Sequence, residues 1–433
     1  MRLSWMSLAL ASAVGVDAIS RISVTGNKFF TSDGDQFFMK GVAYQLTPDD
    51  PLIDTEQCAR DASLMKTLGA NAIRVYHVDS DADHSGCMGE FADAGIYAII
   101  DMDTFDTYIL PNDPWWNQTQ YDRYSAVMDA FADFDNTLGF FVGNEVIALN
   151  NQSMAAPYIK AAARDMKAYR DSKGYHKFPI GYSAADIAEL RPMLQDYLTC
   201  GGNSSENIDM FGLNSYEWCG DVTYQSSGYS NLQSMAVDFP VPIFFSETGC
   251  NTPKPRTFGD QAAIFGDEMV GDWSGALIYE WLEEANDYGL ISYGAQVDAT
   301  VTGSNIDGGY TRKGTPTPVS PDFTNLKNQW ATITPSGVAS SDYTPSVSTR
   351  ACPTSTADGW LVDGNVALPT LGETFSGTYS STPSATVTST ATGTAAGASA
   401  SASSTQNPAS PNKEITGMSA GLVGVMLFFT FWL

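Results

Sequence analysis

The chain has 433 residues, of which 43% are hydrophobic, and it carries a net charge of −27. So acidic a chain does not bind nucleic acid or anionic lipid through its surface charge, because it repels phosphate groups. The acidity otherwise indicates little beyond solubility, so the functional argument depends on motifs.

Residues 1–18 are typical of a secretory signal peptide. Arg2 supplies the positive start, residues 8–11 lie in a short apolar core, and Val16-Asp17-Ala18 is a small-residue cleavage site. The apolar run is too short to span a membrane. We therefore expect this segment to be removed and the protein to be secreted.

Strand and helix patterns alternate through most of the remaining chain. Residues 22–30 come first and predict a small hairpin that closes the bottom of a barrel. Eight strands are then expected, at residues 37–43, 72–76, 97–101, 138–143, 179–182, 210–213, 242–245 and 276–279. Helical patterns lie between them, for example at residues 59–68, 121–131, 156–169 and 260–269.

This alternation predicts an α/β fold, a (β/α)8 TIM barrel at residues 19–330. The alternative is an open, doubly wound sheet. That fold places a glycine-rich phosphate loop after its first strand, where this chain has Gly41-Val42-Ala43-Tyr44-Gln45 instead. The barrel is therefore favoured.

Two of the expected strands end in a glutamate. Asn144-Glu145 follows the fourth strand, and Glu247 ends the seventh. A single such glutamate could simply cap a strand or pair with an arginine, but two at one rim are harder to attribute to chance. Paired carboxyl groups on one rim are what the cleavage of a glycosidic bond requires.

Other strand ends also carry polar or aromatic residues. Aromatic rings stack on the apolar face of a sugar, while amides and carboxylates bind its hydroxyls. One such tyrosine is more often half-buried packing, but five strand ends of this kind suit a sugar site. They are Tyr44-Gln45, Arg74-Val75-Tyr76, Asp101-Met102-Asp103, Asn214-Ser215-Tyr216 and Tyr279-Glu280-Trp281.

Six cysteines match an oxidising compartment, and they allow fifteen pairings. Counting the barrel elements favours one pairing. Two cysteines follow the neighbouring sixth and seventh strands, two stand near the starts of the first two helices, and two remain. The expected disulfides are therefore Cys219–Cys250, Cys58–Cys87 and Cys200–Cys352. The last would tie an extension, residues 331–375, back onto the barrel.

No metal site is expected. The cysteine spacing does not indicate zinc, and Asp79-Ser80-Asp81-Ala82-Asp83 with Glu90 only partly fits a calcium loop. His84 occupies the sixth position, where an EF-hand needs glycine, so a solvated loop is preferred. Three sequons usable in a secreted protein begin at Asn117, Asn151 and Asn203.

The C-terminal part changes character. Between residues 376 and 405, 17 of 30 residues are Ser or Thr and none is charged, which predicts a disordered, O-glycosylated stalk. Small residues at 399–404, a polar spacer and an apolar end at 418–433 follow in the order of a GPI-attachment signal, assigned to residues 406–433. A retained tail anchor is the alternative. The attachment residue stays open within 397–410.

At these residues the chain resembles glycoside hydrolase family 72, the fungal GPI-anchored β-1,3-glucanosyltransferases of the cell wall. The resemblance runs from the hairpin through Cys352. The motifs that carry it are Gly-Val-Ala-Tyr-Gln at 41–45, Ile-Arg-Val-Tyr at 73–76, Gly-Asn-Glu at 143–145, Tyr-Ser-Ala-Ala-Asp at 182–186, Asn-Ser-Tyr-Glu-Trp-Cys at 214–219, Phe-Ser-Glu-Thr-Gly-Cys at 245–250 and Ile-Tyr-Glu-Trp at 278–281. Because Cys352 is the last cysteine, the chain is similar to the subfamily without a cysteine-rich carbohydrate-binding module.

The resemblance implies a retaining reaction in which Glu145 is the acid/base and Glu247 the nucleophile. It also implies that Tyr216 lies beside the nucleophile. Residues implied to contact the glucan donor are Tyr76, Asn144, Asp186, Arg191 and Tyr279. Gln45 and Asp101, both at strand ends, are further candidate substrate-binding residues. The implied partners are β-1,3-glucan donor and acceptor chains and, through a GPI anchor, the outer face of the plasma membrane. No cofactor is expected, and the protein is expected to be monomeric.

Two other functions stay open. A β-1,3-glucan hydrolase would use the same residues, because transfer and hydrolysis differ only in whether an acceptor sugar or water takes the glycosyl group. An acceptor groove lined by aromatic residues such as Tyr44, Trp218 or Tyr288 would favour transfer. A catalytically inactive wall-binding protein is the other, and the intact glutamate pair argues against it.

Overall fold

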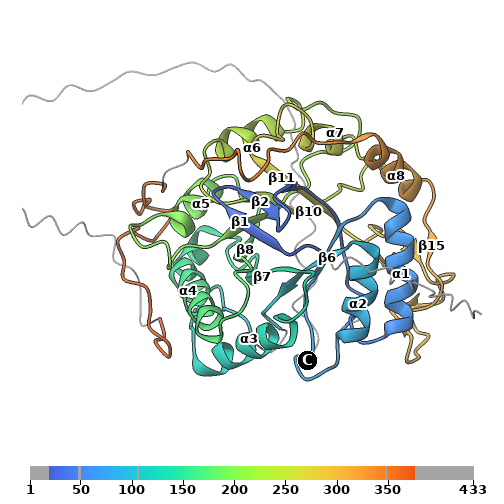
Figure 1. Ribbon diagram of the computed structural model, residues 1–433, viewed down its shortest axis with the longest axis horizontal. Helices are drawn as coiled ribbons and strands as arrows, with labels where there is room; N and C mark the ends of the chain where they lie inside the picture. Colours follow the sequence, from blue (N-terminus) through green and yellow to red (C-terminus); the bar gives the residue numbers. More distant parts are fainter. Residues whose placement is uncertain (1–18, 47–49, 105–106, 347–348, 376–433) are drawn as a thin grey trace, which may run out of the picture. The chain divides into compact units, whose positions relative to one another are not determined.

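Eight parallel strands form a closed barrel, as predicted (Figure 1). The computed structural model describes residues 19–46, 50–104, 107–346 and 349–375, so the expected signal peptide, stalk and GPI signal lie outside the described residues. Each barrel strand pairs with the next in the chain, and the last pairs with the first. The strands are β4 (Met39–Ala43), β5 (Ala72–Val75), β6 (Tyr97–Asp101), β7 (Thr137–Asn144), β8 (Ile180–Ala185), β9 (Met210–Asn214), β10 (Ile243–Thr248) and β11 (Trp273–Ile278).

Helices surround the barrel (Figure 1). They are α1 (Thr55–Leu68), α2 (Ser85–Ala94), α3 (Gln118–Phe131), α4 (Ala156–Lys173), α5 (Arg191–Thr199), α6 (Tyr229–Ala236), α7 (Asp260–Ile264) and α8 (Asp322–Thr332), with a 3-10 turn, η1 (Asn150–Ala155), before α4. Two small two-stranded sheets lie between β11 and α8. They are formed by β12 (Ile291–Ser292) with β15 (Thr317–Pro318) and by β13 (Ile306–Asp307) with β14 (Tyr310–Thr311).

The helix boundaries follow local chemistry. Asp54 caps α1, where its side chain accepts a hydrogen bond from the Gln57 amide at 3.1 Å, and Gly69 ends that helix in the left-handed conformation. The helix expected at 260–269 is shorter than predicted, because α7 ends at Ile264. Phe265 caps the helix and Gly266 comes next; glycine is a poor helix former, so the chain turns there instead.

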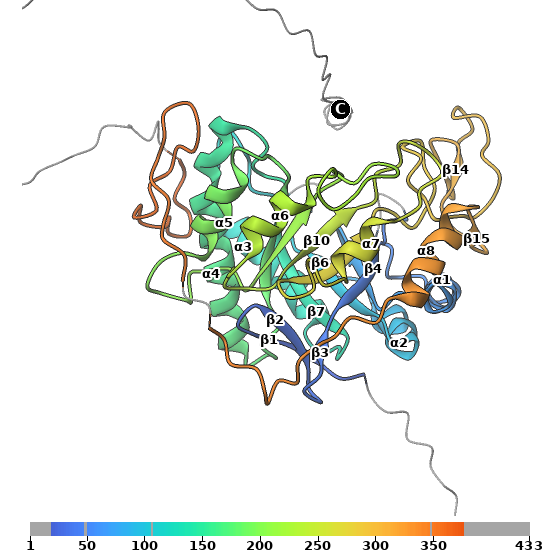
Figure 2. The same ribbon diagram turned by 90° about the horizontal axis from the view of Figure 1, so that it is seen from above.

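The predicted hairpin is present and closes one end of the barrel. It consists of β1 (Ile22–Thr25) and β2 (Lys28–Thr31), and β3 (Gln36–Phe37) adds a third strand. The expected strand at 37–43 is therefore split, because Phe37 pairs with the hairpin while β4 begins at Met39. Figure 2 shows these three strands together at one end of the barrel.

Alternate side chains of the barrel strands point into two different apolar cores. The inner core joins hairpin residues such as Phe29 to inward-facing residues such as Met39, Phe141 and Leu277. The outer core packs the other face of the strands against the helices. A buried parallel strand is apolar on both faces for this reason. Polar side chains therefore appear where the strands end.

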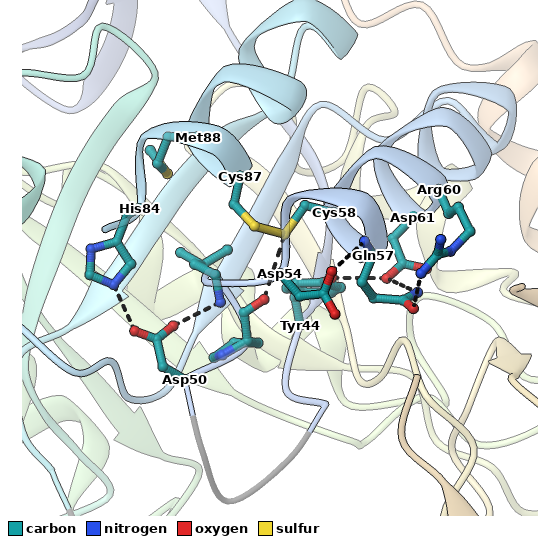
Figure 3. Close-up of a disulfide and its surroundings, with 12 residues drawn as sticks. Tyr44, Asp50, Asp54, Gln57, Cys58, Arg60, Asp61, His84, Cys87 and Met88 are labelled. Carbon is teal, nitrogen blue, oxygen red and sulfur yellow. Dashed lines mark hydrogen bonds and ion pairs between the residues drawn. A yellow bond between two sulfur atoms is a disulfide. The ribbon is translucent and has the colours of Figure 1, made fainter. Parts of the chain in front are cut away.

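All three predicted disulfides are present: Cys58–Cys87, Cys200–Cys352 and Cys219–Cys250. Figure 3 shows the first of them joining α1 to α2, with the His84–Asp50 pair nearby. The buried Asp50 is hydrogen-bonded to His84, with 2.6 Å between Asp50 Oδ2 and His84 Nε2. This contact fixes the start of α2 against the loop before α1.

The extension after α8 packs on the barrel body. Cys352 ties it to Cys200 at the end of α5, and Trp360 is almost fully buried against Tyr197. Further along, the amide of Gly372 donates to the carbonyl oxygen of Trp116 at 2.8 Å. The ordered chain thus continues past Cys352, as expected. Within the described ranges, no helix combines the length and apolar character needed to cross a membrane.

Candidate active site

The two predicted glutamates meet at the C-terminal ends of the barrel strands, here called the barrel mouth. Glu145 directly follows β7, the fourth barrel strand, and Glu247 lies in β10, the seventh. Asn214 of β9 is paired in register with Glu247, and its Nδ2 donates to Glu145 Oε1 at 2.9 Å. The Glu145 backbone has a φ of 48°, a conformation uncommon outside glycine that turns the chain as it leaves the strand.

A buried arginine organises the floor of the site. Arg74 is fully buried in β5, and its guanidinium binds both oxygens of Asp101 at 2.7 and 3.1 Å. It also donates to Asn144 Oδ1 at 2.8 Å and to Glu247 Oε1 at 3.3 Å. Burial alone would lower the pKa of Arg74, but Asp101 and Glu247 beside it raise that pKa, so Arg74 stays charged.

Asp101 is placed differently from the expectation of a substrate-binding residue. Its side chain is 1% exposed, and Arg74 occupies both of its oxygens. Asp101 is therefore the partner of Arg74 rather than a group presented to a ligand. From the sequence alone, Arg74 is named only as part of a polar strand end, with no role assigned to it. The available signal was a charged residue within the apolar strand that contains it.

Tyrosine hydroxyls complete the surroundings of Glu247. Tyr76 donates to Oε1 and Tyr216 to Oε2, each at 2.9 Å. The rings of Tyr76 and Tyr216 stand edge-on to Tyr279, at 6.5 and 6.4 Å between centroids. The Tyr279 hydroxyl accepts a hydrogen bond from Gln45 Nε2 at 3.0 Å. The structure thus places two of these predicted residues on the Glu247 carboxyl group and joins the other two to them through the ring of Tyr279.

Asp186 and Arg191 form an ion pair next to β9. Asp186 Oδ2 accepts from the Ser215 hydroxyl at 2.6 Å, which connects it to the chain directly after Asn214. Arg191 begins α5 and is 3% exposed. The carboxyl group of Asp186 is thus held by both Arg191 and the Ser215 hydroxyl.

Both glutamates have raised pKa values. Burial is the largest influence on Glu247 and raises its pKa to about 7, with Glu145 adding to the rise; Arg74 and the hydroxyls of Tyr216 and Tyr76 act in the opposite direction. Burial also raises the pKa of Glu145, opposed by the Asn214 amide and Arg74. Burial thus raises the pKa of both carboxyl groups of the pair.

The aromatic residues suggested for an acceptor groove are not all at the mouth. Tyr44 is fully buried between the barrel and α1, where its hydroxyl donates to Asp61 at 2.9 Å, so its assignment to the groove is wrong (Figure 3). Trp218 is half-buried and packs edge-on to Tyr229. Tyr288 does lie at the mouth, with its ring 5.6 Å from that of Tyr279.

The acidic loop before α2 binds its own backbone. Asp79 and Asp83 accept hydrogen bonds from the amides of Asp81 and Ser85, at 3.0 and 2.9 Å. Among the described residues, no group of three or more His, Cys, Asp or Glu side chains is arranged to hold a metal ion. Of the predicted sequons, Asn117 caps α3, and Asn151 and Asn203 are exposed.

A (β/α)8 barrel with two carboxyl groups at the ends of its fourth and seventh strands defines a barrel glycoside hydrolase. The chain belongs to glycoside hydrolase family 72, the glucanosyltransferases, whose family model matches residues 11–307.

Curated relatives and solved structures agree with this family. The chain is 39% identical to the 1,3-beta-glucanosyltransferase GAS5 of Saccharomyces cerevisiae, over 84% of this chain and 72% of that protein. It is 40% identical to Protein EPD1 of Candida maltosa, but spans only 61% of that relative's length. It is 36% identical to S. cerevisiae Gas2p in complex with laminaritriose and laminaritetraose, with a TM-score of 0.74 over 82% of this chain and 77% of that one.

Proposed function

We propose that this protein is a retaining β-1,3-glucanosyltransferase. It cleaves a β-1,3-glucan chain internally and transfers the new reducing end to another β-1,3-glucan, which elongates cell-wall glucan. The observation that carries the proposal is the Glu145–Asn214–Glu247 arrangement at the barrel mouth. It is supported by membership of family 72 and by the laminari-oligosaccharides bound to the similar Gas2p structures.

The contacts of the two glutamates support different roles. Glu247 faces a charged guanidinium and two hydroxyl donors, all of which favour its ionised form. Glu145 accepts from a single neutral amide, that of Asn214. Glu247 is therefore assigned as the nucleophile and Glu145 as the acid/base.

The reaction proceeds in two steps. Glu145 donates its proton to the leaving glycosidic oxygen while Glu247 attacks the anomeric carbon, so the glycosidic bond breaks and a covalent glycosyl–enzyme forms. A hydroxyl of the acceptor glucan then loses its proton to Glu145 and attacks the same carbon, which frees Glu247. If water took the place of the acceptor, the outcome would be hydrolysis.

The remaining predicted residues have proposed roles that follow their contacts. Asn144 uses Oδ1 for both Arg74 and Asn214, so its Nδ2 is the atom assigned to the sugar 2-hydroxyl. Residues assigned to direct sugar contact are Tyr76, Gln45, Asp186, Tyr216 and Tyr279. Asp101 and Arg191 are assigned to positioning, because both are buried in ion pairs.

We also propose that the mature protein is monomeric and held at the outer face of the plasma membrane, next to the cell wall. In this organisation the barrel (19–330) and its extension (331–375) stand on the stalk (376–405), and the GPI signal (406–433) is removed. Treatment of membranes with a phosphatidylinositol-specific phospholipase should release the protein. Retention in the membrane after complete digestion would support a tail anchor instead.

The activity is tested with a soluble form that ends at Phe375. It is incubated with a reduced β-1,3-glucan oligosaccharide, and the products are separated by size. Products longer than the substrate establish transfer. Shorter products alone would make the protein a hydrolase on the same glutamates, and an unchanged substrate with folded protein would contradict both activities.

A further inference from the structure

Glu280 is a buried carboxyl group at the barrel mouth that the proposed mechanism does not use. It directly follows Tyr279 at the end of β11, and it is fully buried. Its backbone amide donates to the carbonyl oxygen of Tyr288 at 3.1 Å, and its own carbonyl accepts from the Leu290 amide at 3.0 Å. The segment after β11 therefore folds back on Glu280 and fixes its position.

Both side-chain oxygens of Glu280 accept hydrogen bonds from neutral amides. Gln45 Nε2 donates to Oε2 at 3.0 Å, and Asn286 Nδ2 donates to Oε1 at 2.7 Å. The same Gln45 nitrogen also donates to the Tyr279 hydroxyl. One carboxyl group thus links the end of β4 to the loop after β11, across the place where the barrel closes.

This arrangement is costly for an acidic residue. Burial raises the pKa of Glu280 to about 8, and Glu284 adds to the rise, while the Asn286 and Gln45 amides lower it. The other charged group that acts on it is Glu247, also acidic, and no cation within the described residues pairs with Glu280. A buried carboxyl group without a counter-ion reduces stability. A buried carboxyl group that reduces stability beside a candidate active site suggests a functional role. For Glu280 that role is sought in the side chains that it binds.

We propose that Glu280 is a positioning residue, whose carboxyl group orients the Gln45 amide and the Tyr279 hydroxyl toward the sugar. With Gln45 Nε2 turned to Glu280 and Tyr279, the amide carbonyl of Gln45 is turned away from them and accepts a sugar hydroxyl. The inference rests on the proposed function, because it assumes a glucan at the barrel mouth.

The protonation state of Glu280 controls this orientation. An ionised carboxylate accepts from both amides at once. A protonated one carries a hydrogen on one oxygen, which then accepts more weakly, so the hydrogen bond from one of the two amides weakens. The titratable groups that act on Glu280 are Glu247 of β10, Glu284 of the following loop, and the hydroxyls of Tyr279 and Tyr288.

The test compares Glu280→Gln with the matched control Asp287→Asn, which removes an exposed negative charge from the same loop. We expect Glu280→Gln to raise KM about tenfold with a much smaller change in kcat, and Asp287→Asn to stay close to wild type. The pH dependence of KM between pH 6 and pH 9 should be several-fold smaller in Glu280→Gln than in the wild type, because only Glu247 and Glu145 then titrate at the mouth, and Asp287→Asn should keep the wild-type profile.

A double-mutant cycle separates positioning from a structural role. If Glu280 acts through Gln45, adding Glu280→Gln to a Gln45→Ala variant should cause little further loss. Asn286→Ala changes an exposed residue and frees one oxygen of Glu280, so it should raise KM by a smaller factor even if Glu280→Gln fails to fold.

The inference would be overturned if Glu280→Gln kept the wild-type KM at both pH values. It would also be overturned by fully additive effects in the cycle, or by an unchanged KM in Asn286→Ala. A wild-type protein that neither cleaves nor extends β-1,3-glucan would overturn the proposed function as well.

Discussion

Two opposing effects act on the pKa of Glu247. Burial disfavours its charge, while Arg74 and the hydroxyls of Tyr76 and Tyr216 support it. The proposed nucleophile is therefore readily protonated in the free protein, and its pKa of about 7 lets it ionise near neutral pH. The neighbouring Glu145 lacks such donors, so it is the better store for the proton that the leaving group needs.

Replacing either glutamate by glutamine separates the two roles. We predict that Glu145→Gln and Glu247→Gln each lower turnover of β-1,3-glucan by at least about a thousandfold without unfolding the barrel. On a substrate with a good leaving group, Glu145→Gln should still form the glycosyl–enzyme, because proton donation is then unnecessary, whereas Glu247→Gln should not. Mass spectrometry detects the intermediate. Near-normal turnover in either variant would rule out the assignment.

Arg74 should carry a large share of the stability of the site. Arg74→Met leaves Asp101 buried without its cation, and removing one partner of a buried pair costs about 3–5 kcal/mol. Urea unfolding measures this loss. Arg21→Met serves as the control, because its pair with Asp135 is exposed to solvent and should contribute less than about 1 kcal/mol. Equal losses of unfolding free energy in the two variants would show that the buried ion pair stabilises the protein no more than an exposed one.

At the scale of elements, the strands were predictable because buried parallel strands are continuous apolar runs; each of the eight overlaps its expected range, and the first is split at Phe38. The direction in which each side chain points at a strand end was not predictable. Tyr44 and Gln45 are neighbours, yet Tyr44 enters the outer core and Gln45 reaches the mouth. Which of the two faces inward depends on register, which a single strand does not reveal.

The Cys200–Cys352 disulfide should stabilise the extension more than it supports catalysis. It closes a sequence separation of 152 residues, and disulfides over long separations contribute about 2–5 kcal/mol. We predict that Cys200→Ser combined with Cys352→Ser lowers the unfolding free energy by this amount and exposes the segment around Trp360 to limited proteolysis. Turnover of the folded fraction should stay near wild type, because neither cysteine contacts the mouth residues. Lost turnover in fully folded protein would contradict this division.

At the scale of the whole molecule, the acidity of the chain and the burial of acidic groups act together. The net charge of −27 adds self-repulsion to the folded state as carboxyl groups ionise. Several acidic groups have pKa values raised mainly by burial. They are Glu247 (to about 7), Asp103 (to about 8), Glu280 (to about 8), Glu283 (to about 7) and Asp260 (to about 6).

These raised values set the sign of the pH dependence of stability. Each group contributes stability that is fully present below its unfolded pKa, near 4 to 4.5, and that is lost as the pH rises through its folded pKa. Between pH 5 and pH 8 the folded state therefore binds more protons than the unfolded chain. The buried Lys160, whose pKa burial lowers to about 8, changes its contribution mainly above this window.

We therefore predict that the free energy of unfolding falls as the pH rises from 5 to 8, as measured by urea denaturation at constant ionic strength. Glu247→Gln cannot ionise, so it should remove part of this slope. A matched variant at an exposed carboxyl group, Asp298→Asn, should leave the slope unchanged, because the pKa of Asp298 is lowered by its hydrogen bonds to Thr300 and the group is already ionised throughout this range. Stability that stayed level or rose between pH 5 and pH 8 would contradict the raised pKa values of these buried carboxyl groups.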